Sequence, residues 1–444
     1  MYKTYKKYKK YKKYYIYKYC LILFLLLIFI IQLIRSNSKQ NISDINVDII
    51  KIGYYCHSIK YGGIERVIAL LINYLSKEKI FVHYLISESG ILKDEYSIPN
   101  STRRINLNYP RRSVFDAIEE NHIDILIYNF YNRVEIQKLN KLNKTKIIYY
   151  NHSTFFYWIY LHVYNFKNSI YQIYKQCDYV ISLIPVENDY LFKKWGIKSI
   201  LMYNPSTIEY DSVIPSALTQ KNVIMIGRSD DPIKRYNLGI EAMEKIIKVI
   251  PECKMNIVSV PNDKYVRLIK KLNLSDHVRF VGFHKNVEQY FKNSSLHILP
   301  SLWESYAMAL SEAKIFGLLS IICGLDYLAL AKGGTVIIYD DNPETIAKEA
   351  IKILSDYKYR IKLGQDSRLS MKRHTNQLIA NRWVKLLIYV YKGDNKLIQA
   401  LSDNEEKITD IERDKILKNQ FRLFLRRKPN FKKITFENFI DYSF

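Results

Sequence analysis

Short segments rich in β-branched and aromatic residues recur along most of the chain, and amphipathic segments lie between several of them. Apolar segments of this length predict strands buried on both faces, as in a parallel sheet covered by helices. The first series consists of Asp48–Tyr55, Phe81–Ile86, Asp124–Tyr128, Lys146–Tyr150, Tyr179–Ile184 and Ser199–Met202. Within it, Glu65–Leu75 predicts a helix, because its apolar residues recur at helical spacing.

A second series follows the polar break at Asn204-Pro205-Ser206. It begins with the run NVIMIGR at Asn222 and continues with Lys254–Val260, Val278–Val281, Leu296–Leu299, Leu319–Ile322 and Val336–Tyr339. Helices are predicted at Asn237–Val249, Tyr306–Phe316, Pro343–Leu354 and Gln377–Tyr391. The alternation predicts an α/β fold of two Rossmann-like, doubly wound domains that face a cleft, where ligands bind at the carboxyl ends of the strands.

The pattern also gives the expected domain boundaries. We expect a basic tail at 1–18, a transmembrane segment at 19–34, a linker at 35–47, an N-terminal domain at 48–205, a C-terminal domain at 206–375, a closing helix at 376–392 and a charged tail at 393–444.

The segment Tyr19–Ile34 is apolar except for Gln32, and with the preceding tyrosines it approaches the ~20 residues that span a bilayer. We expect an uncleaved anchor. A cleaved signal peptide is the alternative, although no small-x-small cleavage site follows. Lysines precede the segment, so the positive-inside rule places the N-terminus in the cytosol and the remainder in the endoplasmic reticulum or Golgi lumen of a eukaryote. Residence on the cytosolic face of a membrane is the other possibility.

Composition narrows the class of protein. The chain has 444 residues, of which 48% are hydrophobic, and this suits two packed domains. Its net charge of +25 fits an anionic lipid or a phosphorylated substrate. Nucleic acid ranks last as a partner, because no zinc-finger or RNA-binding motif is present. The five cysteines are far apart, and there is no DxD, HExxH or His/Cys cluster, so we expect neither a disulfide framework nor a metal site.

Two loops could hold an anionic ligand. Gly62 and Gly63 follow a predicted strand and open a predicted helix, where the backbone can approach a ligand closely and the helix N-terminus favours anions. Arg228 and Lys234 follow the first strand of the second series, and their forked and point-like cations suit a diphosphate. An ordinary turn and a solvated basic loop are the alternatives.

A third segment, LPSLWESYAMALSEAKIFG, carries two carboxylates eight positions apart, Glu304 and Glu312. We expect Ser305 to cap a helix that starts near Tyr306, with Glu304 at its mouth. Free amides there would hold phosphate, and the carboxylates would accept hydrogen bonds from sugar hydroxyls. His152 follows another predicted strand and could face the same cleft. An amphipathic helix with exposed glutamates and a structural histidine are the alternatives.

These pieces, in their order, resemble glycosyltransferase family 4, a group of retaining enzymes with the type B two-domain fold. The resemblance covers roughly residues 48–391. It rests on Gly62–Arg66, His152, Asn204-Pro205, Gly227 with Arg228 and Lys234, FVGF at Phe280–Phe283, LPSLWES at Leu299–Ser305, and the pair Glu304 and Glu312 followed by Gly317.

The resemblance implies a metal-independent transferase without a cofactor, which moves a sugar from a UDP- or GDP-linked donor to a glycan or lipid-linked acceptor. By this likeness Arg228 and Lys234 hold the diphosphate, Glu304 contacts the donor sugar, and Glu312 binds the ribose. The backbone amides of Ser305, Tyr306 and Ala307 assist. His152, Gly62 and Gly63 face the reacting centre and the acceptor.

The chain departs from the family pattern at Arg235, where glycine is common, and at SYAMAL, where a glycine-rich run is common. It also departs from it in the segment after Gly317. A membrane-tethered binding or scaffold protein with a degenerate transferase fold is therefore the alternative function, and a sugar-nucleotide epimerase is a weaker one.

Overall fold

The structure, a computed structural model, describes residues 48–60, 62–88, 96–108, 110–157, 170–403, 408–428, 430 and 435–441. The chain divides into two units, Met1–Ile49 and Ile50–Phe444, and both lobes belong to the second. The predicted anchor Tyr19–Ile34 lies outside the described residues. Among the residues that are described, no helix is long and apolar enough to cross a membrane.

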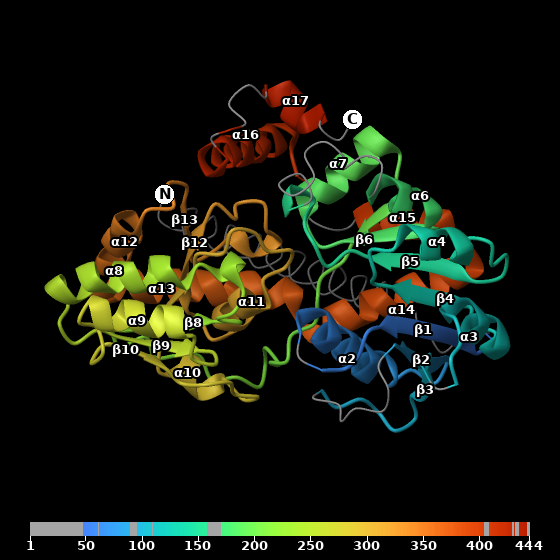
Figure 1. The fold of residues 1–444 in the computed structure, drawn as a ribbon, viewed down its shortest axis with the longest axis horizontal. Helices are drawn as coiled ribbons and strands as arrows, with labels where there is room; N and C mark the ends of the chain where they lie inside the picture. The colour runs from blue at the N-terminus through green and yellow to red at the C-terminus, as the bar shows by residue number, and fades with distance from the viewer. Residues whose placement is uncertain are drawn as a thin grey trace, which may run out of the picture. The chain divides into compact units, whose positions relative to one another are not determined.

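The N-terminal lobe, residues 50–201, contains a seven-stranded parallel sheet (Figure 1). The strand order is β3-β2-β1-β4-β5-β6-β7. Its strands are β1 (Ile50–Cys56), β2 (Phe81–Ser87), β3 (Arg103–Asn106), β4 (Ile125–Tyr128), β5 (Lys146–Tyr150), β6 (Tyr179–Ser182) and β7 (Ser199–Leu201). The predicted strands of the first series are confirmed. The edge strand β3 was not predicted, because its sequence RRIN is mostly polar and exposed.

The C-terminal lobe, residues 222–374, contains a six-stranded parallel sheet in the order β10-β9-β8-β11-β12-β13. Its strands are β8 (Asn222–Ile226), β9 (Lys254–Val258), β10 (Val278–Phe280), β11 (Leu296–Leu299), β12 (Leu319–Cys323) and β13 (Thr335–Ile338). All of them were predicted. In both sheets the strand order reverses at the first strand, between β1 and β4 or between β8 and β11, which is where doubly wound sheets bind ligands.

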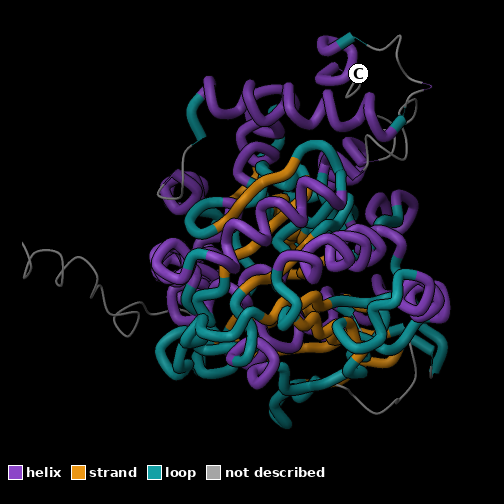
Figure 2. The backbone as a smooth tube through the Cα atoms, turned by 90° about the vertical axis from the view of Figure 1, so that its left-hand side faces the viewer, coloured by secondary structure: helices purple, strands orange, loops and turns teal. Residues whose placement is uncertain are grey.

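Helices lie on both sides of the strands (Figure 2). The N-terminal lobe carries α2 (Gly63–Leu75), α3 (Val114–Asn121), α4 (Arg133–Leu139), α6 (Gln172–Gln176) and α7 (Pro185–Trp195). The C-terminal lobe carries the 3-10 turns η3 (Pro232–Lys234), η4 (Ala329–Ala331) and η5 (Met371–His374), and the helices α8 (Tyr236–Val249), α9 (Asp263–Lys271), α10 (Glu288–Lys292), α11 (Met308–Ile315), α12 (Pro343–Ser355) and α13 (Tyr357–Ser370). Their apolar faces cover the sheets, and this burial is the main favourable term in folding.

The chain then returns to the N-terminal lobe through α14 (Asn376–Lys392), close to the predicted closing helix. Asn376 fixes this return, because its side chain accepts from the N–H of Ser206 at 2.7 Å and donates to the carbonyl of Ser206 at 3.0 Å. Trp383 is fully buried, with its ring 5.1 Å from that of Tyr150. Gly393 ends the helix in the left-handed conformation, which glycine adopts without strain.

The charged tail forms further helices, α15 (Asn395–Asp403), α16 (Asp410–Arg427) and α17 (Phe436–Asp441). Thr409 caps α16 by accepting a hydrogen bond from the N–H of Glu412. Acidic residues occupy the first turn of α16 and arginines its last, which complements the helix dipole. The start of α16 pairs with α7, through Arg413 to Asp189 at 3.1 Å and Asp410 to Lys193 at 3.0 Å.

Candidate active site

The centre of the candidate site is an ion pair between Lys234 and Glu304. Lys234 ends η3, which follows β8, and Glu304 follows β11, the neighbouring strand. The Lys234 Nζ donates to Glu304 Oε1 at 2.6 Å, and Ser301 Oγ donates to the same oxygen at 2.7 Å. The backbone N–H of Glu304 donates to Tyr327 Oη at 3.1 Å. Cation and carboxylate, both partly exposed, therefore meet at the carboxyl edge of the sheet.

The loop after β8 is shaped around Lys234. Gly227 has φ +149°, and a Cβ there would lie 3.4 Å from the Lys234 side chain and 3.3 Å from Tyr236 Oη. Glycine therefore allows both side chains to approach the loop. Arg228 is 67% exposed and pairs with Asp231 at 3.2 Å, so its guanidinium remains accessible to a ligand.

The helix mouth differs from the sequence prediction. Helix α11 begins at Met308 with Ala307 as its N-cap, and Ser305 does not cap it. Ala307 has φ +62°, a left-handed conformation that turns the chain sharply before the helix. Tyr306 is buried, its ring lies 5.8 Å from that of Tyr203, and its hydroxyl lies 3.3 Å from His374 Nδ1. Thus the Tyr306 side chain packs inward, and Ala307 beside it is buried as well.

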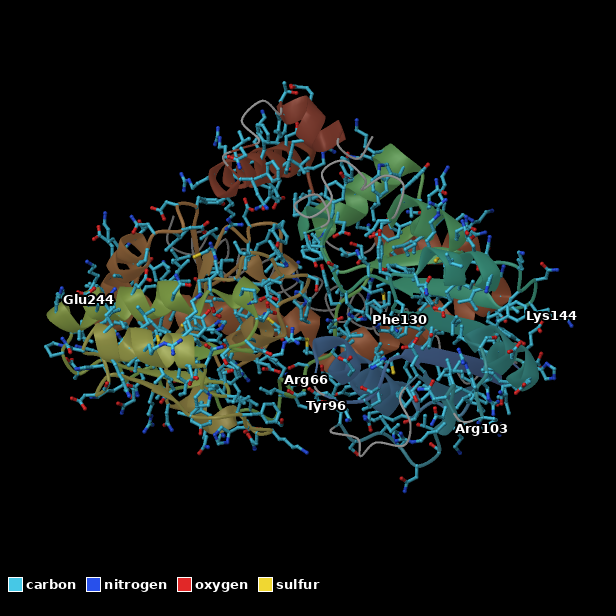
Figure 3. All side chains as sticks on the ribbon, in the orientation of Figure 1. Arg66, Tyr96, Arg103, Phe130, Lys144 and Glu244 are labelled. Atoms are coloured by element: carbon cyan, nitrogen blue, oxygen red, sulfur yellow. The ribbon has the colours of Figure 1, made fainter. Side chains whose placement is uncertain are left out.

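Glu312 is fully buried on α11, yet it is paired with the other lobe. Its Oε1 accepts hydrogen bonds from the Arg66 guanidinium and, at 3.0 Å, from Thr207 Oγ1. Arg66 lies on α2, directly after the Gly62-Gly63 loop (Figure 3), and also donates to Thr207. This contact joins the glycine loop of one lobe to the second glutamate of the other.

The Gly62-Gly63 loop lies within electrostatic range of Arg228. Gly62 is the N-cap of α2 and makes no side-chain cap, and a Cβ at Gly62 would overlap the Glu65 carboxylate. Burial raises the pKa of Glu65, and the charges of Arg228 and His57 oppose that rise. Glu65, in the first turn of α2, is therefore within electrostatic range of the basic loop after β8.

His152 directly follows β5 in the N-terminal lobe. Its Nε2 lies 2.9 Å from Asn129 Oδ1, and its ring lies 4.0 Å from that of Tyr150. Burial lowers the pKa of His152 to about 3, so the imidazole is neutral at physiological pH. The asparagine fixes the ring orientation.

Aromatic contacts connect the His152 loop with the Glu304 loop. The ring of Phe156 lies 4.8 Å from that of Tyr327, and the ring of Tyr157 lies 5.0 Å from that of Trp303. Such tilted pairs are worth about 0.5–1.5 kcal/mol beyond their buried area. Tyr327 in turn accepts the N–H of Glu304, so the two predicted catalytic residues sit on loops that touch.

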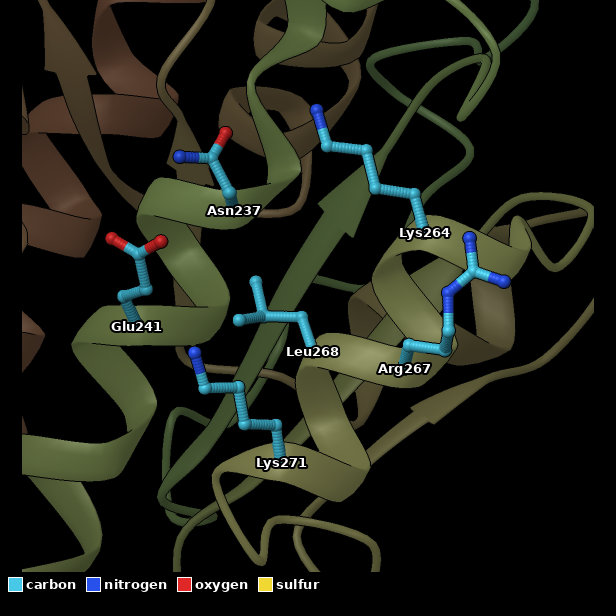
Figure 4. Close-up of a pocket in the computed structure, with 6 residues that line it drawn as sticks. All are labelled: Asn237, Glu241, Lys264, Arg267, Leu268 and Lys271. Carbon is cyan, nitrogen blue, oxygen red and sulfur yellow. The ribbon is translucent and has the colours of Figure 1, made fainter.

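No group of three or more His, Cys, Asp or Glu side chains is arranged to hold a metal in the part of the chain that the structure describes. An open depression of about 410 Å³ lies between α8 and α9 (Figure 4). It contains none of the predicted site residues and is lined by Asn237, Glu241, Lys264, Arg267, Leu268 and Lys271.

Comparison with known proteins agrees with this geometry. The model of Glycosyltransferase Family 4 matches residues 61–205, and that of Glycosyl transferases group 1 matches residues 207–370. An uncharacterized glycosyltransferase of Haemophilus influenzae is 21% identical over 367 residues, which are 76% of this chain and 99% of the relative.

Solved structures show the same fold. Sucrose-phosphate synthase from Thermosynechococcus elongatus superimposes with a TM-score of 0.63 at 17% identity, covering 78% of this chain and all of that one. Anabaena HepE in complex with UDP and glucose superimposes with a TM-score of 0.60 at 14% identity, covering 76% of this chain and 99% of that one. The fold and the two family matches together define a glycosyltransferase of the type B two-domain architecture. The chain belongs to glycosyltransferase family 4.

The structure also adds residues that were not among the predicted site residues. Arg66 and Thr207 hold Glu312, whereas Ser301 and Tyr327 hold Glu304. Arg66 was part of a recognised motif, so its position gave a signal. Nothing in the local sequence marks Thr207 or Tyr327, because their role depends on contacts across 105 and 23 positions of the chain.

Proposed function

We propose that the protein transfers a sugar from a UDP- or GDP-linked donor to a glycan or lipid-linked acceptor, with retention of configuration and without a metal. The observation that carries the proposal is the group of charges at the carboxyl edges of both sheets. Lys234 faces Glu304 at 2.6 Å, Arg228 is exposed on the same loop as Lys234, and Arg66 reaches Glu312 from the other lobe.

The cations suit the leaving diphosphate. Arg228 and Lys234 supply positive charge where negative charge grows during transfer, and fixed cations of this kind can stabilise the transition state in place of a metal. Helix α11 begins directly after Ala307, so its first amides and the helix dipole would favour the same anion.

The remaining predicted residues suit the sugars. Glu304 would contact the donor sugar. Glu312 would bind the ribose once Arg66 releases its carboxylate, or while both bind it. The neutral His152 would hydrogen-bond a hydroxyl at the reacting centre, with Gly62 and Gly63 bordering the acceptor. A UDP donor is favoured by the Anabaena structure, which holds UDP and glucose.

The test is donor binding by the purified protein. Ligand-observed NMR monitors binding across a panel of nucleotide sugars, with and without EDTA. We expect one donor to bind equally in EDTA and to be lost in Lys234→Ala. Transfer to an acceptor should then give a product with the anomeric configuration of the donor. A folded protein that binds no donor would instead support the non-catalytic scaffold.

We also propose that Tyr19–Ile34 anchors the enzyme, with the preceding lysines in the cytosol and the lobes across the membrane. The apolar run and the flanking charge support this orientation. Alkaline carbonate extraction of cells that express the full chain should leave it in the membrane, whereas Leu26→Arg should release it. Protease digestion of sealed vesicles should spare the lobes, and their degradation would place them on the cytosolic face.

A further inference from the structure

Asp341 is held by two arginines that come from distant parts of the chain, close to the loops that carry Lys234 and Glu304. Arg235 Nη2 donates to Asp341 Oδ1 at 2.9 Å. Arg427 makes a forked contact, with Nε 2.8 Å from Oδ2 and Nη2 3.0 Å from Oδ1. The three side chains are between 11% and 15% exposed, so water screens the cluster weakly.

Both arginines also hold the backbone that leads to Glu304. Arg235 Nε donates to the carbonyl of Pro300 at 2.6 Å, and Arg427 Nη1 donates to the carbonyl of Leu302 at 3.0 Å. The N–H of Leu302 donates to the carbonyl of Ile233 at 2.9 Å. The segment 300–302 is therefore fixed on both of its sides, directly before Trp303 and Glu304.

Helix α16 delivers Arg427 to this position. Gln420 Nε2 donates to the carbonyl of Gly324 and to Asp326 Oδ1, both at 2.7 Å, and Asn419 Nδ2 donates to Asp326 Oδ2 at 2.9 Å. These contacts dock the second half of the helix on the loop after β12. Helix α16 lies beyond residue 370, where the family match ends.

The same cluster accounts for a departure from the family pattern. Arg235 stands where glycine is common, and it retains the left-handed conformation, with φ +47°. The strain of that conformation is accepted where the side chain gains a set of contacts, here those with Asp341 and Pro300. Burial raises the pKa of the Asp341 carboxyl, but the two arginines outweigh it and hold that pKa well below its usual range.

We propose that Arg427 is a positioning residue for Glu304, so that the C-terminal tail completes the donor site of the transferase. This inference rests on the proposed function. Arg427 does not touch the donor. It fixes the carbonyl of Leu302, and through it the place at which the Glu304 carboxylate meets Lys234.

The test compares three variants of the full chain. Arg427→Gln removes the fork, Arg427→Lys keeps the charge without the fork, and Arg422→Gln removes an exposed arginine from the same helix. The readouts are the donor KM and kcat, amide hydrogen exchange of residues 299–305, and thermal stability, with kinetics measured well below the Tm of each variant.

We expect Arg427→Gln to raise the donor KM about tenfold, because the segment before Glu304 loses the charge-assisted hydrogen bonds that fix it. Exchange of 299–305 should become faster in the same variant. Arg427→Lys should be intermediate, and Arg422→Gln should match the wild type in KM and in exchange.

A merely structural role would lower kcat through loss of folded protein and leave KM unchanged, which would overturn the proposal. An equal rise of KM in Arg422→Gln would also overturn it. If the wild-type chain transfers no sugar, the proposed function fails by itself. Hydrogen exchange still reports in that case whether Arg427 fixes the segment before Glu304. Unchanged exchange of residues 299–305 in Arg427→Gln would refute the positioning role.

Discussion

Lys234 and Glu304 lie 70 positions apart in the chain, yet their charged atoms are 2.6 Å apart. The contact arises because β8 and β11 are neighbours in the parallel sheet, so the loops after them leave the same edge. Ser301 holds the glutamate from its own loop. The pair is thus held from both loops, and in the proposed transferase this would lower the reorganisation that the reaction requires.

Replacing Lys234 with alanine should lower kcat/KM for the donor about 10²–10³-fold, because a preorganised charge next to the leaving group is lost. The measurement is steady-state transfer with the donor identified by binding. Lys264→Ala provides the control, since it removes an exposed lysine from the depression between α8 and α9. Equal losses in both variants would mean that general positive charge, rather than Lys234, attracts the donor.

Replacing Arg66 with alanine should destabilise the protein by about 3 kcal/mol, because the fully buried Glu312 carboxylate loses its cationic partner. Urea denaturation measures this change. Arg133→Ala, at an exposed position of α4, should stay within about 0.5 kcal/mol of the wild type. Glu312→Gln in the Arg66→Ala background should recover part of the loss, and no recovery would show that the ion pair is not its source.

Glu187 should make stability depend on pH. Burial raises the pKa of Glu187 in the folded protein to about 8 from the usual 4.5, although the N–H of Phe155 and the Asn151 amide oppose the rise. Between these values the unfolded chain releases the proton while the folded chain keeps it. The contribution of Glu187 to the free energy of unfolding therefore falls as pH rises from 4.5 to 8, by up to about 1.4 kcal/mol per pH unit.

The variant Glu187→Gln should remove this dependence of stability on pH. The difference between wild type and variant separates the effect of Glu187 from that of other carboxyls. Denaturation at pH 5 and pH 8 is the measurement. The variant should gain stability relative to the wild type at the higher pH. Glu119→Gln, exposed on α3, should leave the slope unchanged. Parallel pH profiles of wild type and Glu187→Gln would show that the carboxyl is ionised throughout.

Ala307 and Ala309 should respond in opposite ways to glycine. Ala307 is left-handed, so Ala307→Gly removes strain of about 1 kcal/mol and should maintain or raise stability. Ala309 lies inside α11, where the same change should cost about 1 kcal/mol. Ala307→Val should be less stable than both glycine variants, because β-branched residues tolerate positive φ poorly. Calorimetric Tm values of the variants test the order.

The sequence predicted the strands of both sheets except β3, because strands buried on both faces leave continuous apolar runs. That Lys234, Glu304, Glu312 and the glycine loop form one donor site stays a prediction, although the structure does pair Lys234 with Glu304. The start of α11 was predicted wrongly. Ser305 has a favourable side chain for a cap, but the turn at Ala307 places the helix start two residues later than expected.

What the sequence determined by itself is the local pattern: which segments are strands, which are helices, and which polar residues follow strand ends. These follow from periodicity and propensity within a few residues. Only the tertiary structure decided the partners, namely Arg66 with Glu312, Tyr327 with Glu304, and Arg427 with Asp341. Such pairs join positions far apart in the chain, and hydrogen-bond geometry exists only after the lobes and the tail have packed.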